Sequence, residues 1–134
     1  MIVVDTSVLI AVLKNEPDAP HLVRRMAAAS QRYISAGSIL ECGIVVGARY
    51  GDEGLQAMRE LCENLSLDMV PVDADQSRTG YEVFRRYGRG SKHPAQLNFG
   101  DCFAYALAKT RRLPLLFKGD DFIHTDIEPA LKPA

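Results

Sequence analysis

The chain of 134 residues contains no tryptophan, only three cysteines and three histidines, and carries a net charge of only −1. The cysteines are odd in number and form no CxxC pair, which argues against a disulfide framework or a zinc knuckle. The histidines have no spacing typical of metal ligands. We therefore expect neither a disulfide-stabilised secreted domain nor a histidine-based catalytic site.

Long hydrophobic runs are also missing. No apolar segment approaches the roughly 20 residues that a membrane-spanning helix needs, and the first residues, from Ile2 to Asp5, contain no basic leader. The composition, with 47% hydrophobic and 25% charged residues, is that of an ordinary folded protein. We expect a single domain over residues 1–134 that lies in the cytoplasm and makes no contact with a membrane.

Charge is unevenly distributed in spite of the small net value. The segment from Arg78 to Arg112 contains eight basic and two acidic residues, so it carries +6 and the rest of the chain carries −7. Such asymmetry predicts a basic surface beside an acidic pocket, although basic residues often form nothing more than the exposed face of a helix. The candidates for contact with the phosphates of a nucleic acid are Arg85, Arg86, Arg89 and Lys92.

Short apolar segments alternate with helical patterns along the chain. Apolar and β-branched residues predict strands at 33–36, 69–72 and 114–117 and at the N-terminal 2–4, with a weak last strand near 126–128. Apolar periodicity predicts helices at 8–14, 21–30, 38–50, 54–65, 76–87 and 99–112. Gly51 is expected to stop one helix and Asn98 to cap another. The alternation favours an α/β fold with a mainly parallel central sheet.

Acidic residues follow two of the predicted strands. Asp5 comes directly after the first strand, and Asp120 and Asp121 come after the fourth. Ligands of open α/β sheets bind beyond the carboxyl ends of the strands, so we expect these three acids at the same edge of the sheet. Simpler interpretations exist, because Asp5 could cap the first helix and Asp120 and Asp121 could form an ordinary turn.

Two further acids lie within predicted helices. Glu41 shares its helix face with apolar residues at positions 44, 45 and 48. A carboxylate on such a core-facing stripe is costly unless it is paired or bound to a metal. Asp101 lies on a face with small residues, and it could instead complete a helix cap that begins at Asn98.

Crowded carboxylates favour a bound divalent cation. Two negative charges about 4 Å apart cost roughly 4 kcal/mol at an effective dielectric constant near 20, and a cation removes this cost. Oxygen ligands without histidine or cysteine favour Mg²⁺ or Mn²⁺ over zinc. Such ions can activate water and stabilise the leaving oxygen of a phosphodiester. Thr6 and Ser7 could add hydroxyl groups to the site, although both are also good helix-capping residues.

These motifs resemble those of PIN-domain nucleases, and most of all VapC, the toxin of bacterial toxin–antitoxin pairs. The resemblance covers essentially the whole chain and rests on Ile2-Val3-Val4-Asp5-Thr6-Ser7, Glu41, Leu97-Asn98-Phe99-Gly100-Asp101-Cys102 and Leu116-Phe117-Lys118-Gly119-Asp120-Asp121-Phe122. It implies a Rossmann-like, three-layer α/β/α PIN domain with Mg²⁺-dependent endoribonuclease activity, in which Mn²⁺ could replace Mg²⁺. It also implies inhibition by a VapB-type antitoxin and assembly into homodimers.

The same resemblance assigns roles to the acidic residues. Asp121 matches the family position better than Asp120, because it directly precedes Phe122. The mechanism implied is in-line attack of a metal-activated water on an RNA phosphodiester. The residues implied as catalytic and metal-binding are Asp5, Glu41, Asp101 and Asp121. The residues expected to support them from nearby are Thr6, Ser7, Asp120 and Asp126.

Two other functions are compatible with part of the pattern. A phosphoryl-accepting receiver domain would use Asp5, Asp73 and Lys118, but it leaves Glu41 and Asp101 without a role. A PIN-like module could instead bind RNA or protein without cleaving it. The complete acidic set argues against this last interpretation.

Overall fold

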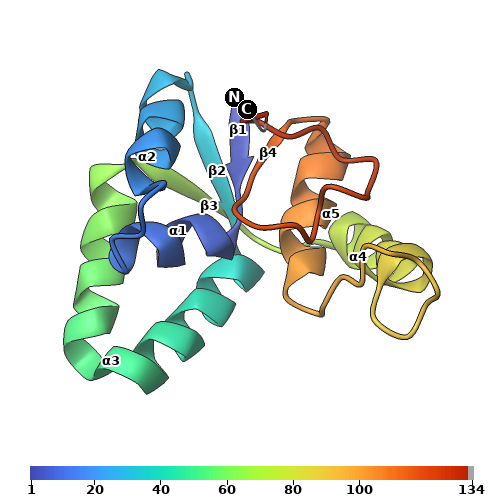
Figure 1. The fold of residues 1–134 in the computed structure, drawn as a ribbon, viewed down its shortest axis with the longest axis horizontal. Helices are drawn as coiled ribbons and strands as arrows, with labels where there is room; N and C mark the ends of the chain where they lie inside the picture. The colour runs from blue at the N-terminus through green and yellow to red at the C-terminus, as the bar shows by residue number, and fades with distance from the viewer. Residues whose placement is uncertain (133–134) are drawn as a thin grey trace.

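The computed structural model describes residues 1–132, in which a four-stranded sheet lies between two layers of helices (Figure 1). The strands pair in the order β3-β2-β1-β4, and every pairing is parallel. This confirms the predicted α/β fold with a parallel central sheet. The strands are β1 (Ile2–Val4), β2 (Arg32–Ser35), β3 (Leu67–Val70) and β4 (Leu115–Leu116).

The helices cover both faces of the sheet. Figure 1 shows α1 (Thr6–Leu13), α2 (Ala19–Ala28) and α3 (Ala36–Asn64) on one face, with α4 (Ala74–Tyr87) and α5 (Asp101–Arg111) on the other. Alternation along β1 explains this arrangement, because successive side chains of a strand point to opposite faces. Ile2 and Val4 pack into the core beneath α1 and α2, whereas Val3 packs with residues of α4 and α5. The predicted three layers are therefore confirmed.

The structure differs from the sequence prediction at Gly51 and near the C-terminus. The helices expected at 38–50 and 54–65 form the two arms of α3, and the chain bends between them at Gly51, whose φ of 66° and ψ of −153° are non-helical. Only glycine adopts that conformation without strain. The prediction of a weak strand near 126–128 is wrong. That segment makes only an isolated bridge, in which the backbone N–H of Leu115 donates to the carbonyl of Glu128 and the backbone N–H of Ala130 donates to the carbonyl of Leu115.

The parallel order of the strands brings three connections to one edge of the sheet. β2 leads into α3, β1 leads into α1 through Asp5, and β4 leads into the segment 117–122. Residues that follow these neighbouring strands therefore meet beyond their carboxyl ends. No helix within residues 1–132 is long and apolar enough to cross a membrane.

Candidate metal centre

Asp5 occupies the turn between β1 and α1. Its carboxylate accepts a hydrogen bond from the backbone N–H of Ser7 at 3.0 Å, so it caps α1, and the residue is only 4% exposed. The Thr6 hydroxyl donates to the carbonyl of Ser38, and the Ser7 hydroxyl accepts from the backbone N–H of Lys118. The capping role of Asp5 is therefore real, while Thr6 and Ser7 tie its turn to α3 and to the segment after β4.

Asp101 is fixed at the start of α5 by a reciprocal cap. Its backbone N–H donates to the side-chain oxygen of Asn98, and the backbone N–H of Asn98 donates to the Asp101 carboxylate, each at 2.9 Å. This is the geometry of a capping box. The helix begins at Asp101 rather than at Phe99 as predicted, because residues 99 and 100 form the turn that these bonds close. Asp101 is only 7% exposed, and the backbone N–H of Asn98 holds its buried carboxylate in place.

Glu41 reaches the same place from α3. Its carboxylate lies directly against Gly100, and a methyl group added to Gly100 would overlap the Oε2 atom of Glu41. Gly100 was not among the predicted site residues, yet only its missing side chain permits this approach. The one feature of the sequence that pointed to Gly100 is its position directly before Asp101 in the motif.

The predicted reason for the importance of Glu41 is wrong. The apolar residues on its helix face do not point to the core, since Ile44 is 63% and Val45 is 42% exposed. The core-facing side chains of this arm are instead Cys42 and Val46. Glu41 belongs to the site because α3 starts directly after β2 and its first turns run past the start of α5, not because its face is buried.

Asp121 is the acid after β4 that joins the group. The charge of Asp121 contributes to the raised pKa of the Asp101 carboxyl group, so the two side chains lie near one another. Asp120 lies exposed beside Gly119, whose φ of 98° marks a turn. Asp121 is exposed in the same turn, but it is the one of the two whose charge acts on Asp101.

The four carboxylates crowd together without a neutralising partner. Burial raises the pKa of Asp5 to about 6, and the charge of Glu41 adds to this effect. Burial also raises the pKa of Asp101 to about 7, with further increases from the charges of Asp5 and Asp121. Within residues 1–132, no lysine or arginine forms an ion pair with any of the four. Negative charge that is buried and unpaired is costly, so the site is suited to a cation.

The donor set fits a hard divalent cation, although the ligands are not yet assembled around one. The available donors are carboxylate oxygens, together with the fully buried Ser38 hydroxyl one turn before Glu41, which has no hydrogen-bond partner among the described residues. In residues 1–132, no three aspartate, glutamate, histidine or cysteine side chains stand in an arrangement that could already hold a metal ion. A bound cation would have to draw the carboxylates inward, and the exposed side of Asp121 leaves room for that movement.

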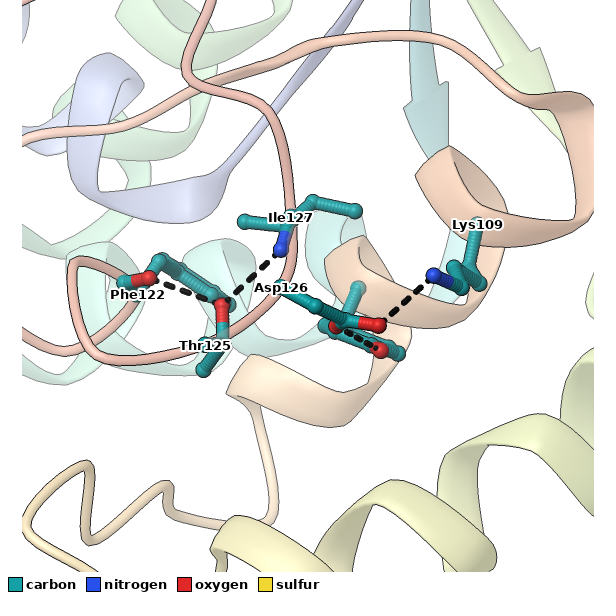
Figure 2. Close-up of polar contacts among 6 residues, drawn as sticks. Lys109, Phe122, Thr125, Asp126 and Ile127 are labelled. Atoms are coloured by element: carbon teal, nitrogen blue, oxygen red, sulfur yellow. Dashed lines mark hydrogen bonds and ion pairs between the residues drawn. The ribbon is translucent and has the colours of Figure 1, made fainter.

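Asp126 is held by other partners. Its carboxylate accepts hydrogen bonds from the Tyr105 hydroxyl and, at 2.7 Å, from the Lys109 ammonium group, as Figure 2 shows for Lys109. These partners lie one and two turns beyond Asp101 on α5. The contacts of Asp126 in the described residues are therefore to α5 and not to the four acids.

The basic candidates lie at the end of α4 and in the loop that follows it. All are exposed, and none forms an ion pair within residues 1–132. The loop is tied to the acidic site by its backbone, because Arg89 donates to the carbonyl of Leu97 and Leu97 donates to that of Tyr87, each at 2.8 Å. Leu97 directly precedes the Asn98–Asp101 cap. The four residues concerned are Arg85, Arg86, Arg89 and Lys92.

An apolar groove of about 550 Å³ runs between α4 and the first half of α5. Its lining is aromatic in large part, and Phe99 and Tyr81 are 75% and 60% exposed. Arg85 lies on its rim. Exposed aromatic side chains gathered in a groove are typical of a surface that another molecule covers.

The profile of the PIN domain family matches residues 2–128. The chain belongs to the PIN-domain family. It is 46% identical over 129 residues to Ribonuclease VapC28 of Mycobacterium tuberculosis, which covers 96% of this chain and 97% of that protein. It is 44% identical over 131 residues to Ribonuclease VapC30 of the same species, which covers 98% and 99%. These relatives confirm the predicted VapC resemblance.

Solved structures share the fold of this PIN domain. The sarcin–ricin loop cleaving toxin VapC20 of Mycobacterium tuberculosis superposes with a TM-score of 0.73 at 18% identity, covering 96% of this chain and 100% of that chain. A toxin–antitoxin complex from Klebsiella pneumoniae gives 0.71 at 19% identity, covering 94% and 93%.

The alternative of a receiver domain is excluded by membership of the PIN-domain family and by the positions of two of its residues. Asp73, its phospho-acceptor, caps α4 by accepting a hydrogen bond from the backbone N–H of Gln76 at 2.9 Å. Lys118 pairs with Glu16 and Asp18 near the end of α1. Asp73 and Lys118 therefore have structural roles in this PIN domain.

The uncompensated charge at Asp101 predicts an unusual stability profile for the metal-free protein. Because the folded-state pKa of Asp101 lies above its unfolded value, the carboxyl group costs stability as the pH rises from about 4 through 7. Asp101→Asn keeps an oxygen for the cap and removes the charge. We expect this variant in EDTA to be more stable than the wild type by about 1 kcal/mol or more at pH 8, with little difference at pH 4.

Urea unfolding at the two pH values measures this difference. Asp75→Asn is the matched control, because Asp75 is an exposed acid paired with Arg78 on α4. Equal stability of wild type and Asp101→Asn at pH 8 would contradict the electrostatic description of the site.

Proposed function

We propose that this PIN domain is a divalent-metal-dependent endoribonuclease and the toxin of a VapBC-type pair. The observation that carries the proposal is the convergence, at the carboxyl edge of the sheet, of four carboxylates that form no ion pair within residues 1–132, two of them buried. Relatives more than 40% identical that are named ribonucleases support the reaction class. The four carboxylates are those of Asp5, Glu41, Asp101 and Asp121.

The fixed and the adjustable carboxylates suit different tasks. Asp5 and Asp101 are buried and oriented by backbone N–H groups, so we assign them as the main ligands of Mg²⁺ or Mn²⁺. The ion would supply a water of lowered pKa and charge stabilisation for the leaving oxygen of the phosphodiester. Glu41 and Asp121 lie nearer to solvent, where they can orient the attacking water for in-line displacement and adjust to the charge of the substrate.

Cleavage of RNA tests this proposal directly. On mixed cellular RNA with Mg²⁺, we expect Asp101→Asn to lower the rate by about 100-fold or more, and EDTA to abolish cleavage by the wild type, because both remove the cation from the site. Gly100→Ala should also impair cleavage, since its methyl group displaces the Glu41 carboxylate. Gly43→Ala is the control, because its methyl group meets only ordinary contacts on α3.

Two results would count against the proposal. Cleavage that neither EDTA nor Asp101→Asn affects would refute the metal mechanism. Absence of any cleavage by the wild type would favour a PIN-like module that binds without cutting.

We propose that the basic residues at the end of α4 and in the following loop bind the RNA phosphates that flank the cleavage site. Arg86 and Arg89 are better probes than Arg85, which lines the apolar groove. In an Asp101→Asn background, in which we expect cleavage to be slow enough for binding to be measured, charge reversal at Arg86 and Arg89 should weaken binding about tenfold or more. It should also reduce the salt dependence of the binding constant, because fewer counterions are released.

Fluorescence anisotropy at several salt concentrations gives both quantities. Arg59→Glu on α3 is the charge-matched control. An unchanged binding constant and salt slope in the Arg86 and Arg89 variants would remove these residues from the RNA interface.

We propose two protein partners, an antitoxin of the VapB type and a second copy of the chain. Solved structures of this fold include a toxin–antitoxin complex and a VapBC2 complex from Rickettsia felis, which supports the first partner. We assign the groove between α4 and α5 to the second copy, because its exposed aromatic lining is unfavourable in water.

A charge in the groove should separate the copies. We expect Tyr81→Glu to convert a dimer into a monomer, as measured by light scattering after size-exclusion chromatography. Tyr50→Glu is the control, since Tyr50 is also exposed but lies on α3 away from the groove. A dimer that persists in Tyr81→Glu places the contact elsewhere.

A further inference from the structure

One face of α5 carries a polar residue at each of three successive turns. Asp101, Tyr105 and Lys109 are four residues apart, so they lie in line along the helix. The segment after β4 is attached to both ends of this line. Asp121 lies near Asp101, and Asp126 binds Tyr105 and Lys109. Figure 2 shows the contact with Lys109. Asp121, near the start of α5, and Asp126, bound farther along that helix, therefore belong to one short segment of the chain.

The Asp126 attachment is a two-point contact. One carboxylate oxygen accepts from the Tyr105 hydroxyl and the other accepts from the Lys109 ammonium group. Tyr105 is buried, and burial raises the pKa of its phenol, so the phenol remains a hydrogen-bond donor at neutral pH. Hydrogen bonds that involve a charged group are stronger than neutral ones. The contact holds a segment that has no strand or helix of its own.

The span between the two acids has little freedom. Phe122 is 2% exposed and its ring packs 5.2 Å from that of Phe117. The Thr125 hydroxyl donates to the carbonyl of Phe122 and accepts from the backbone N–H of Ile127, as Figure 2 shows. Ile127 is buried in the same core as Phe122. Asp126 therefore lies within a closed turn that reaches back to Phe122, the residue after Asp121.

We propose that Asp126 is a positioning residue, which holds Asp121 beside Asp101 by anchoring the segment 121–127 to Tyr105 and Lys109. The inference rests on the proposed function, because it gives Asp121 its place in the metal centre. Asp126 itself would contact neither the ion nor the substrate, because its carboxylate is bound to Tyr105 and Lys109. Its effect on the site passes entirely through Asp121.

A double-mutant cycle separates positioning from general support of the fold. Asp126→Ala is made in the wild type and in Asp121→Asn. Mn²⁺ affinity from calorimetry and the rate of RNA cleavage are measured for all four proteins. We expect Asp126→Ala to weaken both about tenfold when Asp121 is present, the size typical of residues that orient metal ligands. It should have no further effect when Asp121 is already Asn. The loss of thermal stability should be equal in the two backgrounds.

Milder variants guard against misfolding. Asp126→Asn keeps an acceptor for Tyr105 and should recover part of the affinity for Mn²⁺, whereas Tyr105→Phe and Lys109→Met each remove one anchor and should give intermediate losses. Asp75→Ala removes an exposed ion pair on α4 and should change nothing. Amide hydrogen exchange of residues 119–127 should accelerate in Asp126→Ala whether or not metal is bound.

Three outcomes overturn the inference. They are an equal effect of Asp126→Ala on Mn²⁺ affinity in both backgrounds, no effect in either, and unchanged amide exchange of residues 119–127. Failure of the proposed function looks different, because then the wild type itself neither binds Mn²⁺ nor cleaves RNA.

Discussion

Buried negative charge that no lysine or arginine within residues 1–132 neutralises is the constraint on which the site depends. Asp5 and Asp101 are almost fully removed from water, and each has a carboxyl group whose pKa is raised by that burial. A side chain that could rotate would escape such surroundings. Both are prevented from doing so by the backbone N–H groups that they cap. The fold thus uses its own helix caps to hold charges where they are unfavourable.

Capping and metal binding are therefore not competing explanations of the same acids. A carboxylate that caps a helix has one oxygen occupied and its direction set, which leaves the remaining lone pairs aimed in a fixed direction. Pre-orientation of this kind is what a catalytic ligand requires. Removal of the charge should favour the fold at the expense of activity, a trade-off that is common at functional sites.

Much of this architecture could be predicted from the sequence, because strands and caps are local features. The three consecutive buried residues of β1 and the helix-capping residues around Asn98 carry their own signals. The placement of Glu41 could not be derived correctly, since the exposure of Ile44 and Val45 depends on how α3 packs after its bend at Gly51. Periodicity identifies an apolar face, but it does not tell which side of the molecule covers that face.

Contacts between residues that are far apart in the chain could not be predicted from the sequence either. The choice between Asp120 and Asp121 depends on the turn after β4, and the contact between Glu41 and Gly100 joins residues of two helices. The partners of Asp126 on α5 are likewise set by tertiary packing. In each case the residue type was visible in the chain, while its partner was determined by the arrangement of elements around the sheet.

The most direct test of the central claim is the change in melting temperature on addition of Mg²⁺ at pH 7.5, compared between the wild type and Asp101→Asn. If the carboxylates form an unneutralised cation site, millimolar Mg²⁺ stabilises the wild type, because the ion binds the folded state alone, and stabilises Asp101→Asn much less. Equal shifts in the two proteins, or no shift in the wild type, would contradict the account.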